Sequence, residues 1–171
     1  MTPSELEAEL AHHHRAAFGW ALACCRWDRS TAEDVLQATY LKVLDGRARY
    51  GGRAAFQTWL FGVIRRTAAE ERRRRAVGRF LPLSWLNGRR DERAQAPDPE
   101  TASMRADASA RLIAALRLLP TRQRELLHLV FYHDLSIARA AEVLGVAVGT
   151  ARTHYQRGKA RLRELLGEED G

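Results

Sequence analysis

Leu135-Ser136-Ile137-Ala138-Arg139-Ala140-Ala141-Glu142-Val143-Leu144-Gly145-Val146 is the stretch that decides how the second half of this chain folds. It predicts a short helix that Ser136 caps and Gly145 ends, because a tight helix-helix turn needs a left-handed residue that glycine adopts without strain. The small side chains of Ala140 and Ala141 allow a second helix to cross closely. The stretch therefore predicts the first helix and the turn of a helix-turn-helix.

The second helix of this motif is expected from Ala147 to Leu166. Its inward side is apolar, with Val148, Ala151, Tyr155 and Leu162. Its outward side is rich in hydrogen-bond donors, with Thr150, Arg152, Thr153, His154, Gln156, Arg157 and Lys159. Such side chains suit base edges and phosphates of the DNA major groove. A DNA-reading helix is the favoured interpretation, and a simple packing hairpin is the alternative.

The positive charge of the chain is concentrated in two windows. The net charge is +7, from 28 basic and 21 acidic residues. Residues 65–79 contain seven arginines and two glutamates, and residues 149–163 contain five basic residues and no acid, so each window carries +5. The rest of the chain is net negative. This focusing is typical of proteins that bind a polyanion, although a solvated helix face can also produce one such window.

The remainder of the chain shows helical periodicity and no alternating run long enough for a strand. A first helix is expected through Leu6–Leu22, a second after Asp28 with Ser30 or Thr31 as its N-cap, and a third from Phe56 into the first arginine window. Periodicity resumes at Ala108, and Thr121 is the expected N-cap of the helix after Pro120.

A break separates these two helical parts. Residues 79–104 contain Pro82, Asn87-Gly88, Pro97 and Pro99, which interrupt helices. The sequence thus predicts an all-α fold of two small helical domains, residues 1–78 and 106–171, joined by a linker over residues 79–105. Within this linker Phe80–Leu86 is strongly apolar. It is expected either to fold back onto a domain or to dock on a partner protein.

The sequence gives little indication of a catalytic or metal-binding site. No nucleophile constellation, metal-carboxylate cluster or glycine-rich phosphate loop is present, which argues against an enzyme and against a cofactor. Consecutive histidines His12-His13-His14 cannot all face one ion from a helix. Cys24 and Cys25 are adjacent, and a disulfide between them is badly strained; packed thiols are favoured over a redox or metal role.

The N-terminus and the hydropathy of the chain bear on its location. Met1–Leu10 carries three glutamates, and nowhere do eighteen apolar residues follow one another. We therefore expect no secretory signal, no membrane insertion and a cytoplasmic location.

Aromatic residues stand beside the first arginine window. Phe56, Trp59 and Phe61 precede Arg65 on one predicted helix. Bases of single-stranded DNA stack on aromatic rings while guanidinium groups hold the backbone. At helical spacing, however, Phe56 and Trp59 could equally belong to the core.

Four separated motifs together resemble those of a bacterial extracytoplasmic-function sigma factor of the sigma-70 type, and they follow the order of that family. They are Ala32–Val43 (AEDVLQATYLKV), Phe56–Arg65 (FQTWLFGVIR), Leu119–Glu125 (LPTRQRE), and Glu142–Val146 followed by Gly149-Thr150 and Lys159–Leu165. The resemblance covers nearly the whole chain.

The resemblance implies a protein that binds core RNA polymerase and initiates transcription at promoters. Residues 1–78 would be a region-two domain that binds polymerase and the minus-ten element, and residues 106–171 a region-four domain that binds the minus-thirty-five element. Polymerase would be contacted through its β′ and β subunits, with Asp34, Leu36, Gln37 and Leu41 facing the β′ clamp. Phe56, Trp59, Arg65, Arg73 and Arg74 would bind minus-ten DNA, and Thr150, Arg152, Thr153, His154 and Arg157 minus-thirty-five DNA. An anti-sigma factor is a possible further partner.

A free-standing DNA-binding regulator is the competing interpretation. It would use the helix-turn-helix without polymerase. Such a regulator has no need of Glu33-Asp34 with Gln37 on an exposed helix, or of aromatics beside an arginine window, so the first domain distinguishes the two.

Overall fold

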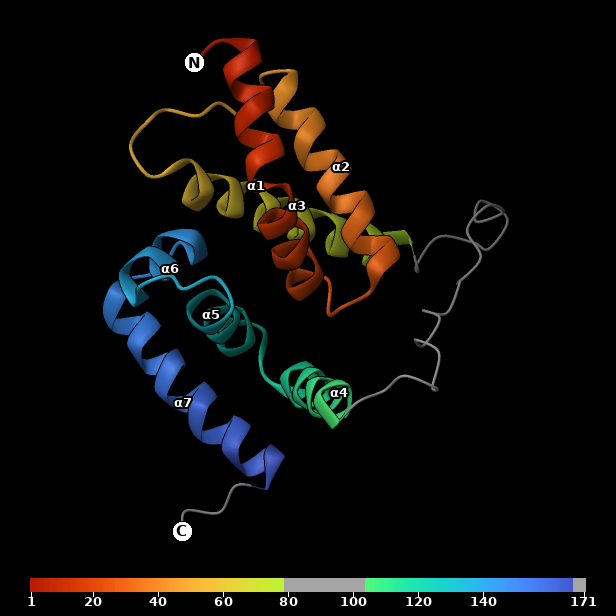
Figure 1. Ribbon diagram of the computed structural model, residues 1–171, viewed down its shortest axis with the longest axis vertical. Helices are drawn as coiled ribbons and strands as arrows, with labels where there is room; N and C mark the ends of the chain where they lie inside the picture. The colour runs from red at the N-terminus through yellow and green to blue at the C-terminus, as the bar shows by residue number, and fades with distance from the viewer. Residues whose placement is uncertain (79–103, 168–171) are drawn as a thin grey trace.

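The computed structural model describes residues 1–78 and 104–167, and within these residues every regular element is an α-helix. The all-α prediction is confirmed. The seven helices of the described part are α1 Pro3–Cys24, α2 Arg29–Leu44, α3 Phe56–Gly78, α4 Met104–Leu118, α5 Thr121–Phe131, α6 Ile137–Leu144 and α7 Val148–Leu166 (Figure 1). The apolar stretch Phe80–Leu86 and most of the expected linker lie outside the described residues.

Helix starts follow local side-chain chemistry, with two departures from the prediction. The Asp28 carboxylate, and not Ser30 or Thr31, caps α2 by accepting a hydrogen bond from the Thr31 backbone N–H at 3.3 Å. Pro120, and not Thr121, occupies the N-cap position of α5, and no side chain caps that helix. Asp28, Ser30 and Thr31 are all good capping residues near the start of α2, and Thr121 is the first residue within α5 and not its cap.

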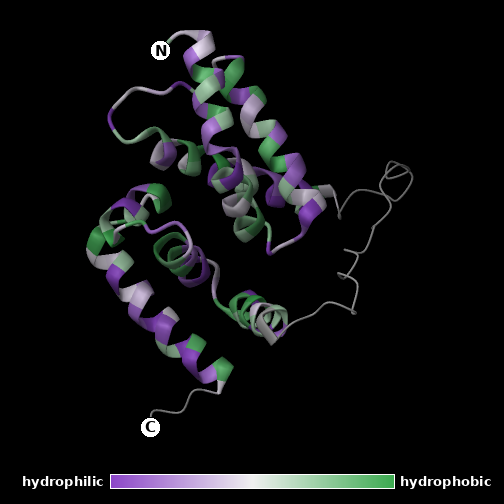
Figure 2. Ribbon diagram, in the orientation of Figure 1, coloured by the Kyte–Doolittle hydropathy of each residue, from purple (hydrophilic) through white to green (hydrophobic). Residues whose placement is uncertain are grey.

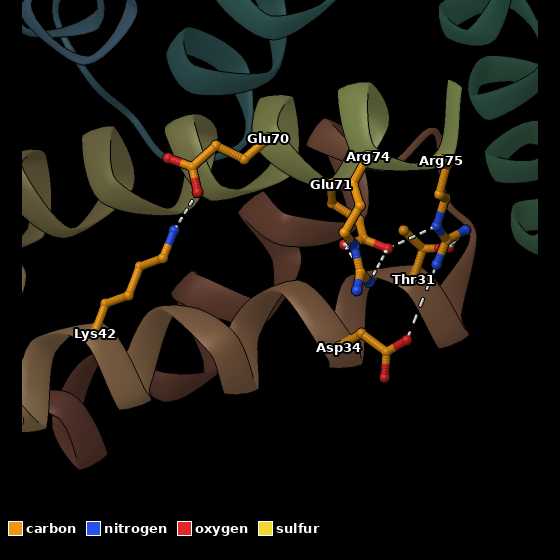
Figure 3. Close-up of polar contacts among 7 residues, drawn as sticks. All are labelled: Thr31, Asp34, Lys42, Glu70, Glu71, Arg74 and Arg75. Carbon is orange, nitrogen blue, oxygen red and sulfur yellow. Dashed lines mark hydrogen bonds and ion pairs between the residues drawn. The ribbon is translucent and has the colours of Figure 1, made fainter. Parts of the chain in front are cut away.

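The first three helices pack around Trp20, whose side chain is fully buried with Phe61, Leu60 and Ile64 of α3. The Trp20 indole Nε1–H donates to the Phe61 carbonyl oxygen at 3.0 Å, so the polar edge of the ring is satisfied inside the core. Polar contacts add to the packing of α2 on α3, where Lys42 pairs with Glu70 and Arg75 Nη1 donates to Thr31 Oγ1 at 2.7 Å (Figure 3).

The two helices and the turn of the helix-turn-helix form as predicted, whereas Val148, which was expected on the inward side of the second helix, is 38% exposed. The Ser136 hydroxyl accepts from the Arg139 N–H at 3.2 Å, and Gly145 ends α6 with φ 65° and ψ 39°. Ala140 and Ala141 are buried where α6 meets its neighbours. Gly158 allows α7 to approach α5, because a Cβ there would lie 3.2 Å from Leu127 Cδ1. Hydrophobic and hydrophilic residues share each of these helices, as amphipathic packing requires (Figure 2).

The two groups of helices, α1–α3 and α4–α7, are packed against each other. α5 lies against α1, and α6 lies against α3 (Figure 1). One continuous cluster of buried apolar residues runs from Leu10 in α1 through Phe61 in α3 to Leu129, Val143 and Ala151 in the second group. No feature of the sequence predicted this packing of the two groups against each other.

Candidate partner and nucleic-acid interfaces

A shallow apolar groove lies on the outer face of α2, where it meets α1. Its volume is about 410 Å³, and Leu36, Gln37 and Leu41 line it together with His14, Phe18, Arg29, Glu33, Tyr40 and Leu44. Leu41 and Leu44 are 54% and 52% exposed, so both add apolar surface to the groove. The His14 ring Nδ1 and the Tyr40 hydroxyl lie 3.0 Å apart and join the two helices along the groove.

Three of the four residues expected to bind polymerase are thus brought together. Leu36 is buried at the floor, whereas Gln37 and Leu41 are exposed. Asp34 does not line the groove. Its carboxylate lies 3.9 Å from Arg75 of α3, beside the Glu71–Arg74 pair (Figure 3). An exposed apolar groove rimmed by polar side chains has the composition of a protein-binding surface.

A second groove is basic and follows the loop between α2 and α3. Two adjoining pockets of about 470 and 460 Å³ share Arg49, Trp59 and Arg66. The first is also lined by Lys42, Arg47 and Glu70, and the second by Tyr50, Arg53 and Glu142. We call the two together the basic groove. Its arginines outnumber its carboxylates, so an anionic ligand would be favoured there.

Aromatic side chains form one wall of the basic groove. Trp59 is half-buried and lies within van der Waals reach of Tyr50 and Phe56, with ring centroids 5.3 and 5.2 Å away. Phe56 is buried, and stacks on His13 at 5.8 Å. Phe56 therefore supports Trp59 from the core side, and Trp59 is the ring that a nucleic-acid base can reach.

The loop itself is held in shape by short polar contacts. The Tyr50 hydroxyl donates to the Ala54 carbonyl at 2.5 Å, and Arg47 bonds Asp45 through its backbone N–H at 3.0 Å and its Nε at 2.6 Å. The bond from Arg47 holds the pKa of the Asp45 carboxyl below its usual range. A preformed loop presents Arg49 and Arg53 without a large ordering cost on binding.

The arginines expected at this site do not share one environment. Arg65 Nε donates to Glu125 of α5 at 2.9 Å, and its side chain is only 17% exposed, so it is engaged inside the molecule. Arg73 is exposed. It follows Arg66 by seven residues, or about two helical turns, so both lie on the same face of α3. Arg74 is exposed and pairs with Glu71 at 2.7 Å, and this contact lowers the pKa of the Glu71 carboxyl.

The loop arginines were missed by the sequence reasoning. Residues 47–53 read R-A-R-Y-G-G-R, and their glycines mark a break between helices. Three arginines interleaved with a tyrosine were the available signal for a nucleic-acid surface. The structure brings Arg47, Arg49 and Arg53 to the same groove as Trp59.

The outer face of α7 is the third candidate surface. Thr150, Arg152, Thr153 and Arg157 are exposed, and His154 is half-buried. Thr153 Oγ1 donates back to the Gly149 carbonyl at 3.2 Å. Lys159 lies over the Tyr155 ring at 5.3 Å, one turn further along. The expected DNA-reading residues therefore lie together on the N-terminal half of the helix.

Possible metal ligands and two thiols also occur in the described part of the chain. No group of three or more His, Cys, Asp or Glu side chains gathers there closely enough to hold a metal ion. Cys24 and Cys25 are free thiols. Burial raises the pKa of both, that of Cys25 to about 12, so both stay protonated and weakly nucleophilic at neutral pH. None of the described helices combines the length and apolar character needed to cross a membrane.

Comparison with known proteins covers both helical groups. Residues 10–77 match the model of Sigma-70 region 2, and residues 109–162 match that of Sigma-70, region 4. RNA polymerase sigma factor CarQ of Myxococcus xanthus is 33% identical over 142 residues, which cover 80% of this chain and 75% of that protein. ECF RNA polymerase sigma factor SigM of Mycobacterium tuberculosis is 32% identical over 155 residues, covering 91% of this chain and 74% of the relative.

Solved structures agree in fold. The sigma factor RpoE from Bartonella quintana, in complex with the anti-sigma factor NepR, superposes with a TM-score of 0.76 at 23% identity, over 97% of this chain and 99% of that one. CnrH, in complex with the cytosolic domain of CnrY, gives a TM-score of 0.65 at 21% identity, over 99% and 92% of the two chains. The chain thus belongs to the extracytoplasmic-function sigma factors of the sigma-70 family, which direct RNA polymerase to promoters and initiate transcription.

Proposed function

We propose that this sigma factor divides its work among the three surfaces described above. The apolar groove of α2 binds the β′ clamp of core polymerase, the basic groove holds the minus-ten strand, and the outer face of α7 reads the minus-thirty-five element. The observation that supports this division best is the joining of Trp59 with Arg49, Arg53 and Arg66 in one groove. A ring for base stacking amid backbone-binding guanidinium groups suits single-stranded DNA.

The same proposal assigns residues 1–78 to the region-two domain, 79–105 to the linker and 106–171 to the region-four domain. Within region two, Asp34 acts at the edge of the polymerase surface, since it lies one turn from Gln37 and next to Arg75. Arg73 and Arg74 extend the basic surface along α3, and Arg65 becomes available to DNA only when its contact with Glu125 is broken.

The protein acts by binding and carries out no chemistry of its own. It works in the cytoplasm, where its polymerase partner is found. An anti-sigma factor is a further proposed partner, because RpoE of Bartonella quintana, which shares this fold, is bound to the anti-sigma factor NepR in its structure.

In vitro transcription tests the proposed function directly. The purified protein is added to core polymerase over a library of genomic fragments, and the transcripts are mapped. We expect initiation from a small set of fragments that share two elements upstream of the start. Core polymerase alone is the control. Transcripts that do not depend on the protein would contradict the proposal.

Base reading and phosphate binding on α7 can be separated by two substitutions. Arg152→Ala is expected to reduce discrimination at one base pair of the upstream element by roughly 10- to 100-fold, because it removes a base-edge contact worth about 1–3 kcal/mol. Lys159→Ala is expected to weaken binding to all sequences alike and to lower the salt dependence by about one counterion. Fluorescence anisotropy of holoenzyme on matched and mismatched duplexes measures both. Equal losses on every duplex for both variants would contradict the role of Arg152.

A further inference from the structure

Lys159 of α7 is held by an aromatic ring and not by a carboxylate. Its Nζ lies 5.3 Å from the centroid of the Tyr155 ring, one helical turn earlier. Arg161 pairs with Glu164 at 2.7 Å, whereas no carboxylate of the described residues pairs with Lys159. A carboxylate would compete with an incoming anion, but a ring orients the ammonium through its π electrons and leaves it other N–H donors for a ligand. Lys159 therefore keeps its charge available to an anion.

A second ring supports Tyr155 from the neighbouring helix α5, which packs beside α7 (Figure 1). Phe131, at the end of α5, stacks on Tyr155 with ring centroids 5.9 Å apart and an interplanar angle of 22°. Phe131 is 60% exposed, and Tyr155 is half-buried. Gly158 allows the two helices to lie close at this level, because a Cβ there would lie 3.2 Å from Leu127 Cδ1. The position of the tyrosine ring is thus set by α5 as well as by α7.

The place of Lys159 along α7 decides which part of a DNA duplex it can reach. α7 begins at Val148, and the rise of an α-helix puts Lys159 about 16 Å further along the axis. The major groove is about 12 Å wide and about 8.5 Å deep. When the N-terminal residues of a reading helix contact base edges in such a groove, a side chain this far along lies at the level of the sugar-phosphate backbone. Lys159 is therefore placed for a phosphate and not for a base.

Lys159 also belongs to a row of side chains that runs along one side of α7. Residues three or four apart on a helix lie on the same face. The row consists of Arg152, Gln156, Lys159 and Arg163, and none of the four is acidic. Arg152, Gln156 and Arg163 are exposed, and Lys159 is half-buried against the ring. The row thus leads from the proposed base-reading position at Arg152 outwards to cations that suit the backbone of one strand.

We propose that Phe131, Tyr155 and Lys159 form a phosphate-binding site on the side of α7, in which the two rings position the Lys159 ammonium for one phosphate of duplex DNA. Lys159 touches the phosphate, and Tyr155 and Phe131 are positioning residues. The site contributes affinity for any duplex, because a phosphate contact carries no sequence information of its own. It rests on the proposed role of α7 as the DNA-reading helix, and the rings are tested separately from that role.

The rings reduce the conformational freedom that Lys159 loses on binding. A lysine side chain has a flexible four-carbon stem, and ordering it on a ligand costs conformational entropy. Tyr155 already restricts the ammonium in the free protein, so less freedom is lost when a phosphate arrives. A cation–π contact at a partly exposed site is equivalent to about two- to fivefold in affinity. This range sets the size of the effect expected when the ring is removed.

Binding of the holoenzyme to labelled duplexes tests the site. One fluorescein-labelled duplex carries the upstream element of a promoter found by in vitro transcription, and a second duplex of the same length has an unrelated sequence. Fluorescence anisotropy gives the Kd for each over a range of salt concentrations. Lys159→Ala is expected to weaken binding to both duplexes about tenfold and to lower the slope of log Kd against log salt by about 0.9. Arg111→Ala removes an exposed cation from α4 and is the control, with a Kd within about twofold of the unmodified protein.

Variants of the rings separate positioning from packing. Tyr155→Leu keeps an apolar side chain but removes the ring, and it is expected to weaken binding to both duplexes about two- to fivefold. Tyr155→Phe keeps the ring and should bind like the unmodified protein. Phe131→Ala, at an exposed position, is a second variant with a smaller loss in the same direction. In a Lys159→Ala background Tyr155→Leu should cause no further loss, because the ring acts through the ammonium.

A purely structural role for Tyr155 predicts a different pattern. A tilted α7 would displace the base-reading side chains, so discrimination between the two duplexes would fall, and the loss would recur in the Lys159→Ala background. That pattern, or an unchanged Kd for Tyr155→Leu, would overturn the positioning role of the rings and leave α7 as the reading helix. An unchanged Kd and salt slope for Lys159→Ala would overturn the phosphate site as a whole. If Arg152→Ala also changes binding to neither duplex, α7 is not the DNA surface, and the proposed function fails with the site.

Discussion

Replacing Gln37 by arginine and Leu41 by aspartate is expected to lower the affinity for core RNA polymerase by about 1000-fold. Leu41 is 54% exposed on the apolar groove of α2, and Gln37 lines the same groove. A partner that covers the groove removes both side chains from water. An aspartate that is buried there without a partner loses its hydration, which weakens binding. If each of the two positions is a hot spot that contributes about 2 kcal/mol, the binding free energy falls by roughly 4 kcal/mol.

The variant should fold normally, because both positions face solvent in the free protein. Affinity is measured by displacement of the labelled protein from core polymerase. Val77→Asp is the matched control, since Val77 is 63% exposed on the same domain but does not line the groove. Retention of full affinity by the double variant, or an equal loss in the control, would remove the groove from the polymerase surface.

Asp34 is predicted to contribute less than Gln37. Its carboxylate lies 3.9 Å from Arg75 and outside the groove. An exposed ion pair of this kind contributes little to stability, so removal of Asp34 leaves the fold intact. The motif around residues 33–37 brought Asp34 and Gln37 together as one polar surface, whereas the structure assigns them to different neighbours.

Short-range features of the sequence were sufficient to predict the helix-turn-helix. Ser136 and Gly145 act on backbone atoms within a few residues, so their roles as cap and terminator could be predicted from the sequence. The start of α2 was less certain because Asp28, Ser30 and Thr31 are all good capping residues, and their order alone does not decide among them.

Contacts between distant residues could not be predicted in this way. Arg65 is one of seven arginines in its window, and nothing in that window distinguishes it as the partner of Glu125, 60 residues later. The position of Phe56 could not be predicted either, because its helical spacing fits a ring on the surface as well as a ring in the core. Its burial against His13 depends on how α1 crosses α3. The resemblance to a family predicted where the binding surfaces lie, and the fold determines which side chains are exposed on them.

The loop between α2 and α3 shows why the basic groove was missed. Periodicity identifies helices, and a segment with glycines at 46, 51 and 52 is set aside as a break. Binding residues are nevertheless common on loops that a rigid scaffold positions. Here the scaffold is the packing of α2 on α3, including the Lys42–Glu70 pair, which borders the groove (Figure 3).

Reversing the charge of Arg49 and Arg66 together is expected to reduce promoter opening by the holoenzyme about 1000-fold. Both arginines line both halves of the basic groove, as Trp59 does. A charge-assisted hydrogen bond to phosphate contributes about 1.5–3 kcal/mol, and a glutamate in its place adds repulsion. Two such losses amount to at least about 4 kcal/mol. The salt dependence of binding should also fall, by about 0.7 per lost contact with a single strand.

A control of equal charge separates local contacts from the field of the whole protein. Arg15→Glu with Arg111→Glu changes the net charge by the same amount, and both side chains are exposed outside the basic groove. At 0.15 M salt, exposed charges beyond about 8 Å are largely screened, so this control should lose only a few-fold. Permanganate reactivity of unpaired thymines in the promoter measures opening, and polymerase affinity is checked in parallel. A comparable loss in the two double variants would show that net charge, and not the groove, drives opening. A selective loss at Arg49 and Arg66 with polymerase binding intact would assign strand capture to the loop between α2 and α3.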